Sequence, residues 1–244
     1  MRKQIGTLSE KTIHAVVKNY YEPNEDCQEI PIEGKCADIY IQSKAGLECR
    51  DEDGTYGKIY EIQTREWSRL KPKLDIFLKD YDVTVVLPIP DHKKIIWIDP
   101  LTGELNESGR NIKYGNDYTG FKEMYAVRDY VNHPHFHIIL LYMDMLEYKL
   151  LTGRSKDRKK YGAVRYDRIP LDLTNEIVLS NPKDYMMFVP MDLPEKFTSA
   201  IFAKAAKIRK SDVGRVIGLL RITGVIERLD EKDGRSYLYR VKEN

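Results

Sequence analysis

Apolar residues near the start of the chain first recur at helical spacing and then alternate with polar ones. The helical stretch carries its apolar residues three or four positions apart: Ile13, Val16, Val17 and Tyr20. This spacing predicts an amphipathic helix that begins near Thr7, whose hydroxyl suits an N-cap. The alternation that follows predicts two strands, residues 28–34 and 35–42, which meet as a hairpin at Glu33-Gly34.

The next part of the chain places one helix between two strands. Residues 57–64 predict one strand, and residues 82–89 form a β-branched run typical of the centre of a sheet. Between them, residues 65–81 carry an apolar face, and Pro72 predicts a break or a start within that helix. The face consists of Trp67, Leu70, Leu74, Phe77 and Leu78. Because a helix between two strands is typical of a parallel crossover, the order of elements predicts an α/β fold with a mixed sheet.

The middle of the chain carries weaker patterns. Residues 93–105 predict a further strand and turn, residues 120–131 a helix, and residues 136–143 a strand. Residues 147–170 begin as a strand and continue as a basic loop.

Three prolines between residues 181 and 197 predict a domain boundary. We expect an α/β domain over residues 1–190, with its core at about 7–105, and a second domain over residues 191–244. The part of the first domain that follows its core is the least regular in its pattern.

The second domain has the pattern of two helices and a β-hairpin. An Ala-rich helix is predicted at residues 198–208, and a second helix between its N-cap Ser211 and its stop Gly224. The last residues alternate around an Asp233-Gly234 turn, which is a strong hairpin signal. Two helices followed by a hairpin resemble a winged helix-turn-helix, a module that places its second helix in a DNA groove.

The predicted second helix has an apolar stripe and an opposite face of mixed character. The stripe consists of Val213, Val216, Ile217 and Leu220. The opposite face carries Arg215 beside Leu219 and Ile222. Such a face suits DNA, and it equally suits an internal or dimer contact.

Charge and composition limit the classes of protein that fit. The net charge is +2, so any affinity for nucleic acid has to come from local basic patches. No apolar run approaches the roughly 18 residues of a membrane span, and the first residues lack a signal-peptide core. We therefore expect a cytoplasmic protein that does not contact membranes. Cys27, Cys36 and Cys49 form no CxxC pair, which predicts reduced, buried thiols.

Two of the predicted strands carry an acid at an apolar centre, Asp38 in residues 35–42 and Glu61 in residues 57–64. If these strands are neighbours, the two carboxylates converge and can hold Mg²⁺ or Mn²⁺ together with a backbone carbonyl such as that of Ile62. Facing acids repel each other, so at least one of them should have a raised pKa without metal. The alternative is that both acids are solvated or paired with Arg or Lys.

The order of these elements resembles the core of the PD-(D/E)XK nuclease superfamily, the restriction-endonuclease-like fold, over roughly residues 7–90. The resemblance implies a metal-dependent nuclease in which Asp38 and Glu61 bind Mg²⁺ or Mn²⁺. It also implies a role for Glu10 on the first helix, although Thr7 and Glu10 have capping-box spacing as well. Gln63 stands where the superfamily usually has Lys and would position the attacking water. The chain is also similar to uncharacterised bacterial proteins that share its "EIQT" and "WIDP-TGE" segments.

The departure at Gln63 keeps a second reading open, in which the chain is a non-catalytic DNA-binding or regulatory protein on a degenerate nuclease fold. In either case DNA is the expected partner, RNA stays open, and a homodimer is the default assembly. The residues predicted to contact phosphates are Arg65, Lys71, Lys73, Arg158, Lys159, Lys160, Arg165, Arg209, Lys210, Arg215 and Arg235.

Three histidines in "HPHFHI" suggest one more possibility. His133, His135 and His137 would share one face of a strand and could hold a transition metal. Pro134 disfavours regular pairing there, so exposed or lightly buried histidines are the alternative.

Overall fold

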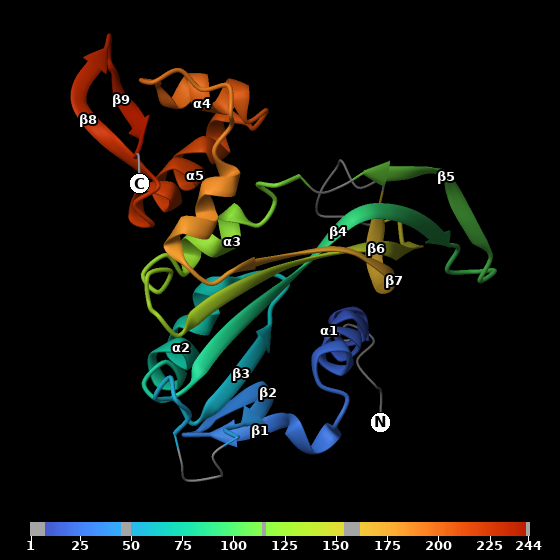
Figure 1. Ribbon diagram of the computed structural model, residues 1–244. Helices are drawn as coiled ribbons and strands as arrows, with labels where there is room; N and C mark the ends of the chain where they lie inside the picture. The colour runs from blue at the N-terminus through green and yellow to red at the C-terminus, as the bar shows by residue number, and fades with distance from the viewer. Residues whose placement is uncertain (1–7, 45–49, 114–115, 154–161, 243–244) are drawn as a thin grey trace.

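The protein is described by a computed structural model for residues 8–44, 50–113, 116–153 and 162–242. One large twisted sheet forms the centre, and a small lobe of two helices and a hairpin lies beyond one of its faces (Figure 1). The helices are α1 (Leu8–Tyr21), α2 (Lys71–Phe77), α3 (Phe121–Ala126), α4 (Ser199–Ala205) and α5 (Lys210–Ile222), and the 3-10 helices are η2 (Glu25–Cys27), η3 (Trp67–Leu70) and η5 (Pro182–Phe188).

The strands of the large sheet run in the order β1-β2-β3-β4-β6-β7, and β5 pairs with β4. Their bounds are β1 (Gln28–Ile32), β2 (Lys35–Gln42), β3 (Gly57–Ile62), β4 (Asp82–Ile98), β5 (Leu105–Lys113), β6 (Phe136–Leu151) and β7 (Ala163–Leu179). The pairs β3–β4 and β4–β6 are parallel, whereas the other pairs are antiparallel. The fold is therefore α/β with a mixed sheet, as the pattern predicted.

The first hairpin turns where the sequence places it, because Glu33 and Gly34 both adopt positive φ, 45° and 75°. The predicted helix after β3 starts anew near Pro72, which lies in the first turn of α2. Its whole apolar face is buried: Trp67, Leu70, Leu74, Phe77 and Leu78.

Strand β4 is one continuous strand, although the sequence predicted two. Pro88 and Pro90 read as a break, because proline cannot donate to a sheet. On the side of β3, the pairing of β4 ends at Val86, and β5 pairs from His92 onward. The prolines therefore lie where neither β3 nor β5 pairs with β4, while β6 continues along the other side of the strand.

The loop predicted after β6 was also wrong in part. Residues 163–170 belong to β7, which pairs with β6 along most of its length. Their mixture of charged and apolar residues reads as a loop because this strand lies at the edge of the sheet, where many of its side chains are exposed.

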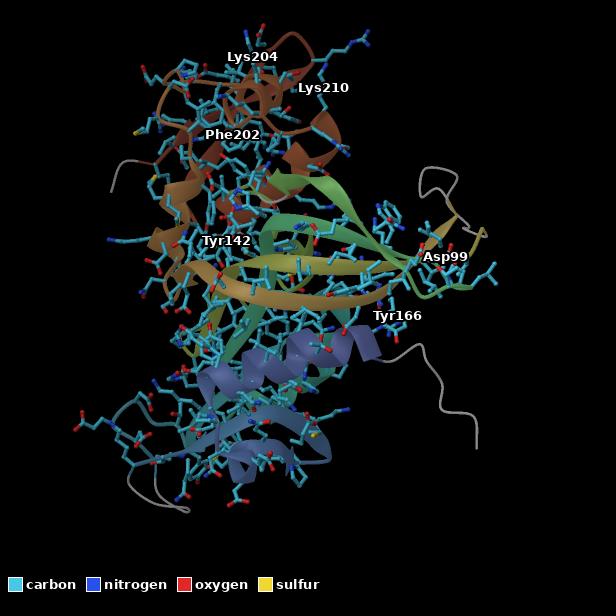
Figure 2. All side chains as sticks on the ribbon, turned by 90° about the vertical axis from the view of Figure 1, so that its right-hand side faces the viewer. Asp99, Tyr142, Tyr166, Phe202, Lys204 and Lys210 are labelled. Carbon is cyan, nitrogen blue, oxygen red and sulfur yellow. The ribbon has the colours of Figure 1, made fainter. Side chains whose placement is uncertain are left out.

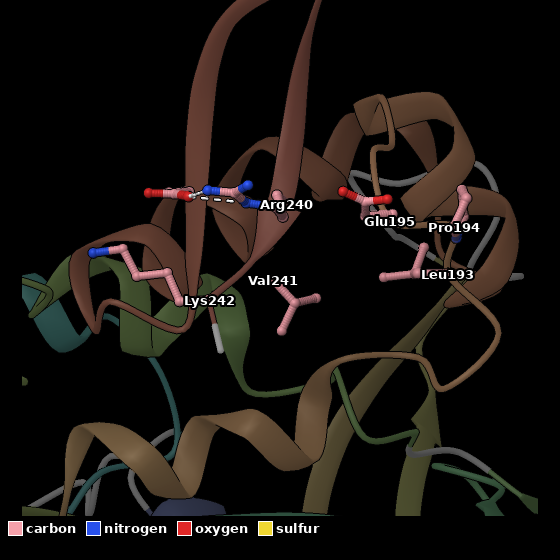
Figure 3. A pocket seen from close by; sticks show the side chains of 7 residues that line it. Leu193, Pro194, Glu195, Arg240, Val241 and Lys242 are labelled. Atoms are coloured by element: carbon pink, nitrogen blue, oxygen red, sulfur yellow. Dashed lines mark hydrogen bonds and ion pairs between the residues drawn. The ribbon is translucent and has the colours of Figure 1, made fainter. Parts of the chain in front are cut away.

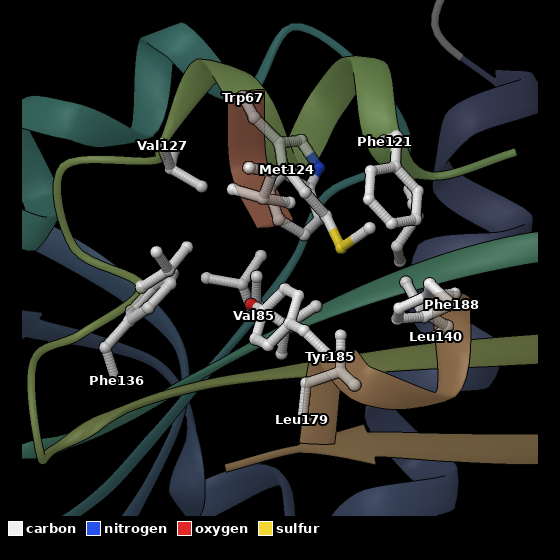
Figure 4. Packing of buried hydrophobic residues seen from close by; sticks show 14 of the residues in the cluster. Trp67, Val85, Phe121, Met124, Val127, Phe136, Leu140, Leu179, Tyr185 and Phe188 are labelled. Atoms are coloured by element: carbon white, nitrogen blue, oxygen red, sulfur yellow. The ribbon is translucent and has the colours of Figure 1, made fainter. Parts of the chain in front are cut away.

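Two apolar clusters cover the two faces of the sheet. Helix α1 packs on one face through Ile13 and Val17, whereas Val16 and Tyr20 are about half exposed, so the predicted apolar face was half wrong. The other face carries the larger cluster, in which the aromatic residues of η3, α3 and η5 meet strands β4 and β6 (Figure 4).

The C-terminal lobe has the predicted elements, two helices and the hairpin of β8 (Ile226–Asp233) and β9 (Ser236–Val241). Thr198 caps α4 through a hydrogen bond from Ile201 N. Helix α5 begins at Lys210 rather than after the predicted cap Ser211, and Gly224 follows its end with φ of 75°.

Helix α5 of the C-terminal lobe packs against α3, which itself packs on the large sheet (Figure 1). A Cβ at Gly218 would lie 2.8 Å from the Tyr125 ring, and Asn132 Nδ2 donates to Ile222 O at 2.9 Å. Leu219, predicted on the outward face, is fully buried. Part of the face predicted for DNA is thus an internal contact, and one apolar cluster continues from the sheet into this lobe.

Candidate functional site

The two predicted acids lie on neighbouring antiparallel strands. Strand β2 pairs with β3 so that Ile39 faces Tyr60, and the next step of this register places Asp38 opposite Glu61. Both side chains are buried, with Asp38 8% and Glu61 1% exposed. The structure therefore brings together the two carboxylates that the sequence singled out.

Asp38 is held by two hydrogen bonds to its Oδ2 atom. Ile62 N donates to it at 2.7 Å, and His14 Nε2 on α1 lies 3.1 Å away. Burial alone would raise the pKa of Asp38, but His14, Lys73 and the Ile62 amide outweigh it and lower this pKa below its ordinary value. Asp38 is therefore the charged member of the acid pair.

Glu61 is held by Lys73 from α2. Lys73 Nζ donates to both carboxylate oxygens, at 2.7 Å and 3.0 Å. Burial, and then the charge of Asp38, raise the pKa of Glu61 to about 8 despite this lysine. The expectation that one acid has a raised pKa without metal is confirmed. Lys73, predicted as a phosphate contact, donates to Glu61, and its contact with phosphate stays a prediction.

A group of three possible metal ligands includes Asp38. Its carboxylate, His14 and Glu29 offer ligand atoms that all lie within 4.8 Å of one another. Lys18 also bonds Glu29, whose pKa this contact lowers, and Cys36 Sγ lies 3.3 Å from the same carboxylate. His14 was missed in the sequence, because one polar residue beside an apolar helix face carries no signal of its target.

A cavity of about 160 Å³ opens beside His14. Gln63 lines it, just beyond the end of β3, and its Nε2 donates to Arg65 O at 2.7 Å. The other lining residues are Ile62, Thr64, Arg65, Glu66 and Arg69. Two arginines therefore line this cavity, of which Arg69 pairs with Glu66 at 3.0 Å, and neither Asp38 nor Glu61 is among its lining residues.

A larger cavity of about 670 Å³ lies in the C-terminal lobe (Figure 3). The base of the β8–β9 hairpin and residues 193–195 line it, and Arg240 pairs with Glu227 at its edge. None of its lining residues belongs to the acid site. Its size therefore does not mark it as the place of the predicted chemistry.

The predicted phosphate contacts are spread over the molecule. Lys71 pairs with Asp129 at 2.7 Å, and Arg215 with Asp212 at 3.3 Å. The exposed ones among the described residues are Arg65, Arg165, Arg209, Lys210 and Arg235. Arg158, Lys159 and Lys160 lie outside the described residues, as does the side chain of Glu10.

Arg165 contacts a second buried acid, Glu147, which the sequence reasoning missed. Glu147 on β6 is 3% exposed, and four cations surround its carboxylate. They are Lys93 at 3.1 Å, Arg168 at 3.2 Å, Lys149 at 3.4 Å and Arg165 at 3.7 Å. Burial would raise the pKa of Glu147, but these cations lower it to about 2.

Among the described residues, His133, His135 and His137 do not form a group of possible metal ligands. His137 lies on β6 and contacts Asp82 at 2.6 Å, whereas His133 and His135 lie before the strand. All three are half-buried, which agrees with the alternative. The prediction of buried thiols was wrong, because Cys36 is exposed and Cys27 is half-buried, and Cys49 lies outside the described residues.

None of the helices in the described ranges is both long enough and apolar enough to cross a bilayer.

Comparisons with known proteins place the chain in a family. A family model described as "Domain of unknown function (DUF8091)" matches residues 11–180. An uncharacterised protein of Treponema pallidum (strain Nichols) is 26% identical over 157 residues, which cover 64% of this chain and 57% of that protein. The chain thus spans little more than half the length of this relative, and no solved structure matches it. Since the matched residues include most of α1 and all strands of the large sheet, the chain belongs to the DUF8091 family.

Proposed function

We propose that the protein is a metal-dependent phosphodiesterase that acts on nucleic acid, with DNA as the first substrate to test. The observation that carries this proposal is the pair of buried acids on neighbouring strands, Asp38 and Glu61, with Lys73 beside them. Two buried carboxylates that share one lysine are an unfavourable arrangement unless a cation completes it.

The donor set suits a hard divalent cation. Asp38 and Glu61 supply carboxylate oxygens, and a carboxylate has room for a further partner beside its hydrogen bonds. His14 on Asp38 offers an additional nitrogen. A bound Mg²⁺ or Mn²⁺ would lower the pKa of a coordinated water and neutralise charge that develops on the phosphodiester.

Lys73 supplies the cation that the resemblance places at the position of Gln63. It follows Glu61 by twelve residues and reaches both of its oxygens from α2. In this role Lys73 would offset charge at the scissile phosphate, so Gln63 need not. Gln63 Nε2 is used by Arg65 O, which leaves its Oε1 to accept a hydrogen bond from the attacking water.

The C-terminal lobe would hold the substrate as a winged helix does. Four of its exposed basic residues lie around the turn between α4 and α5, where Figure 2 labels Lys204 and Lys210: Lys204, Lys207, Arg209 and Lys210. Because part of α5 packs on α3, this end of the helix is the surface left for a phosphate backbone. A restriction-endonuclease-like core, a cytoplasmic location and a homodimer that cuts both strands complete the proposal.

One observation favours a second candidate, a non-catalytic DNA-binding protein. Lys73 already donates to both oxygens of Glu61, and such a contact can stabilise a site that has lost its metal. The two candidates differ in whether metal binds at Asp38.

The deciding experiment is cleavage of labelled single- and double-stranded DNA and RNA with Mg²⁺, Mn²⁺ or EDTA. Wild type should cut only with metal. Asp38→Asn, Glu61→Gln and Lys73→Met should each lower the rate at least 100-fold. Asn at position 38 keeps an acceptor for Ile62 N, so it tests the charge rather than the fold.

Lys79→Ala is the matched control, because Lys79 is an exposed lysine directly after α2 and should leave the rate unchanged. Cleavage that persists in Asp38→Asn and Glu61→Gln would exclude this site as the catalyst. Salt-sensitive DNA binding without cleavage, and without metal binding at Asp38, would favour the second candidate.

A further inference from the structure

A second group of metal-ligand side chains lies on the sheet, well along β4 from the acid site. Asp91, His92 and Asp144 place a carboxylate oxygen, an imidazole nitrogen and a second carboxylate oxygen within 4.8 Å of one another. His92 Nδ1 lies 3.2 Å from Asp144 and 3.6 Å from Asp91. All three side chains are partly exposed, so an ion could reach them.

A β-bulge produces this group. Pro90 of β4 pairs with Met143 of β6, and Lys93 pairs with Met145, so the two residues 91–92 face the single residue Asp144. A bulge of this kind turns consecutive side chains toward the same region. The irregularity continues into the next strand, where the β6–β7 register also shifts between Met143 and Met145.

A buried hydroxyl faces the same end of the sheet. Met143 and Met145 belong to the cluster on the α1 side, so Tyr142 and Asp144 share the opposite face of β6. Tyr142 is 6% exposed, and its hydroxyl has no hydrogen-bond partner among the described residues.

The charge balance here differs from that of the nearby Glu147. Within the described part of the chain, no Lys or Arg lies within ion-pair distance of Asp91 or Asp144, whereas Glu147 has four such cations. Among the described side chains, two carboxylates thus lie beside one imidazole without a lysine or arginine in contact. A divalent cation matches both the charge and the ligand types.

We propose that Asp91, His92 and Asp144 form a second metal site, for a divalent transition metal of the Zn²⁺ type. Its remaining positions would carry water, and one such water would supply the hydrogen-bond partner that the Tyr142 hydroxyl lacks. The metal would fix the bulge between β4 and β6, beside the last residue of β5.

The test is a Zn²⁺ titration of the chelator-treated full chain against a chromophoric competitor, which reports both the number of sites and their affinity. His92→Ala should remove one equivalent of bound Zn²⁺. Asp144→Asn should weaken the same site at least tenfold while keeping an acceptor for His92 N. Asp172→Asn, which changes an exposed acid on β7, is the matched control and should bind as wild type does.

The Asp38→Asn variant should still bind the one equivalent of Zn²⁺ that depends on His92. This result would separate the second site from the proposed nuclease site. Zinc-edge anomalous diffraction from wild-type crystals provides a check that needs no variant, with a peak expected between His92 and Asp144. The proposal fails if wild type binds no Zn²⁺, if His92→Ala and Asp144→Asn bind as wild type does, or if the anomalous peak lies elsewhere.

Discussion

Glu61 and Glu147 are both almost completely buried, yet their environments push their ionisation in opposite directions. Glu61 has one lysine and a neighbouring acid, and its pKa is raised to about 8. Glu147 has four surrounding cations, and its pKa is lowered to about 2. Because burial is similar, the balance of neighbouring charges decides which form each carboxylate takes.

The difference separates a structural acid from one suited to bind a cation. Glu147 is over-neutralised, so a metal ion would be repelled from it. At the acid pair, Asp38 carries the charge and Glu61 holds a proton at neutral pH, so a divalent ion that displaced this proton would lie between two carboxylates with Lys73 beside them. The same reasoning gives three expected outcomes in solution.

The largest effect should come from Glu147→Gln. Removing this carboxylate takes from Lys93, which is 6% exposed, its hydrogen bond to Glu147 at 3.1 Å and keeps its charge beside Arg168. We expect a loss of about 3 kcal/mol in the free energy of unfolding, measured by denaturant melts at pH 7. Glu61→Gln should cost less than about 1 kcal/mol in the same buffer with EDTA. Equal losses for the two variants would show that burial, not charge balance, distinguishes these sites.

The pH dependence of stability should show the next largest effect. The folded pKa of Glu61 is about 8 and its ordinary value is 4.5, so between these values the folded state holds a proton that the unfolded state has released. Stability from this group therefore falls as pH rises through that window, with a slope of up to about 1.4 kcal/mol per pH unit.

Glu147 has the opposite sign, because its lowered pKa contributes stability above pH 4.5 that is lost as pH falls toward 2. Denaturant melts of wild type and Glu61→Gln from pH 5 to 8.5 check the first window. Their difference should change by at least about 1 kcal/mol in favour of the variant as pH rises. A difference that stays flat with pH would refute the raised pKa of Glu61.

The smallest effect should be the stabilisation by metal. Mn²⁺ at tenfold excess over its Kd should stabilise wild type by about 1.4 kcal/mol and raise the melting temperature by a few degrees. Asp38→Asn should remove this shift in calorimetric scans. Glu147→Gln is the control, since its lower melting point should still rise with Mn²⁺ by the wild-type amount. A shift that survives in Asp38→Asn would place the metal elsewhere.

Local chemistry made several elements predictable from the sequence. Gly34 and Gly234 fixed two hairpin turns through positive φ, and the apolar stripe around Leu74 fixed the buried face of α2. The adjacency of Asp38 and Glu61 followed from the order of strands.

Contacts between distant segments were not predictable in the same way. Lys73 adjoins the buried face of its helix, but nothing local says that its amine turns toward Glu61. His14 reaches Asp38 from a separate element for the same reason. Leu219 was placed on the outward face because the packing of α5 on α3 depends on the whole fold.

The two prolines of β4 have a consequence for the buried backbone of this strand. Val86 O accepts from Gln63 N, so the backbone groups of residues 86, 88 and 90 point toward the β3 side. Residues 82–90 are all buried, and neither β3 nor β5 pairs with residues 88 and 90 on this side. A buried N–H without a partner costs free energy, and proline has no N–H, so Pro88 and Pro90 remove two donors that the sheet would leave unsatisfied here.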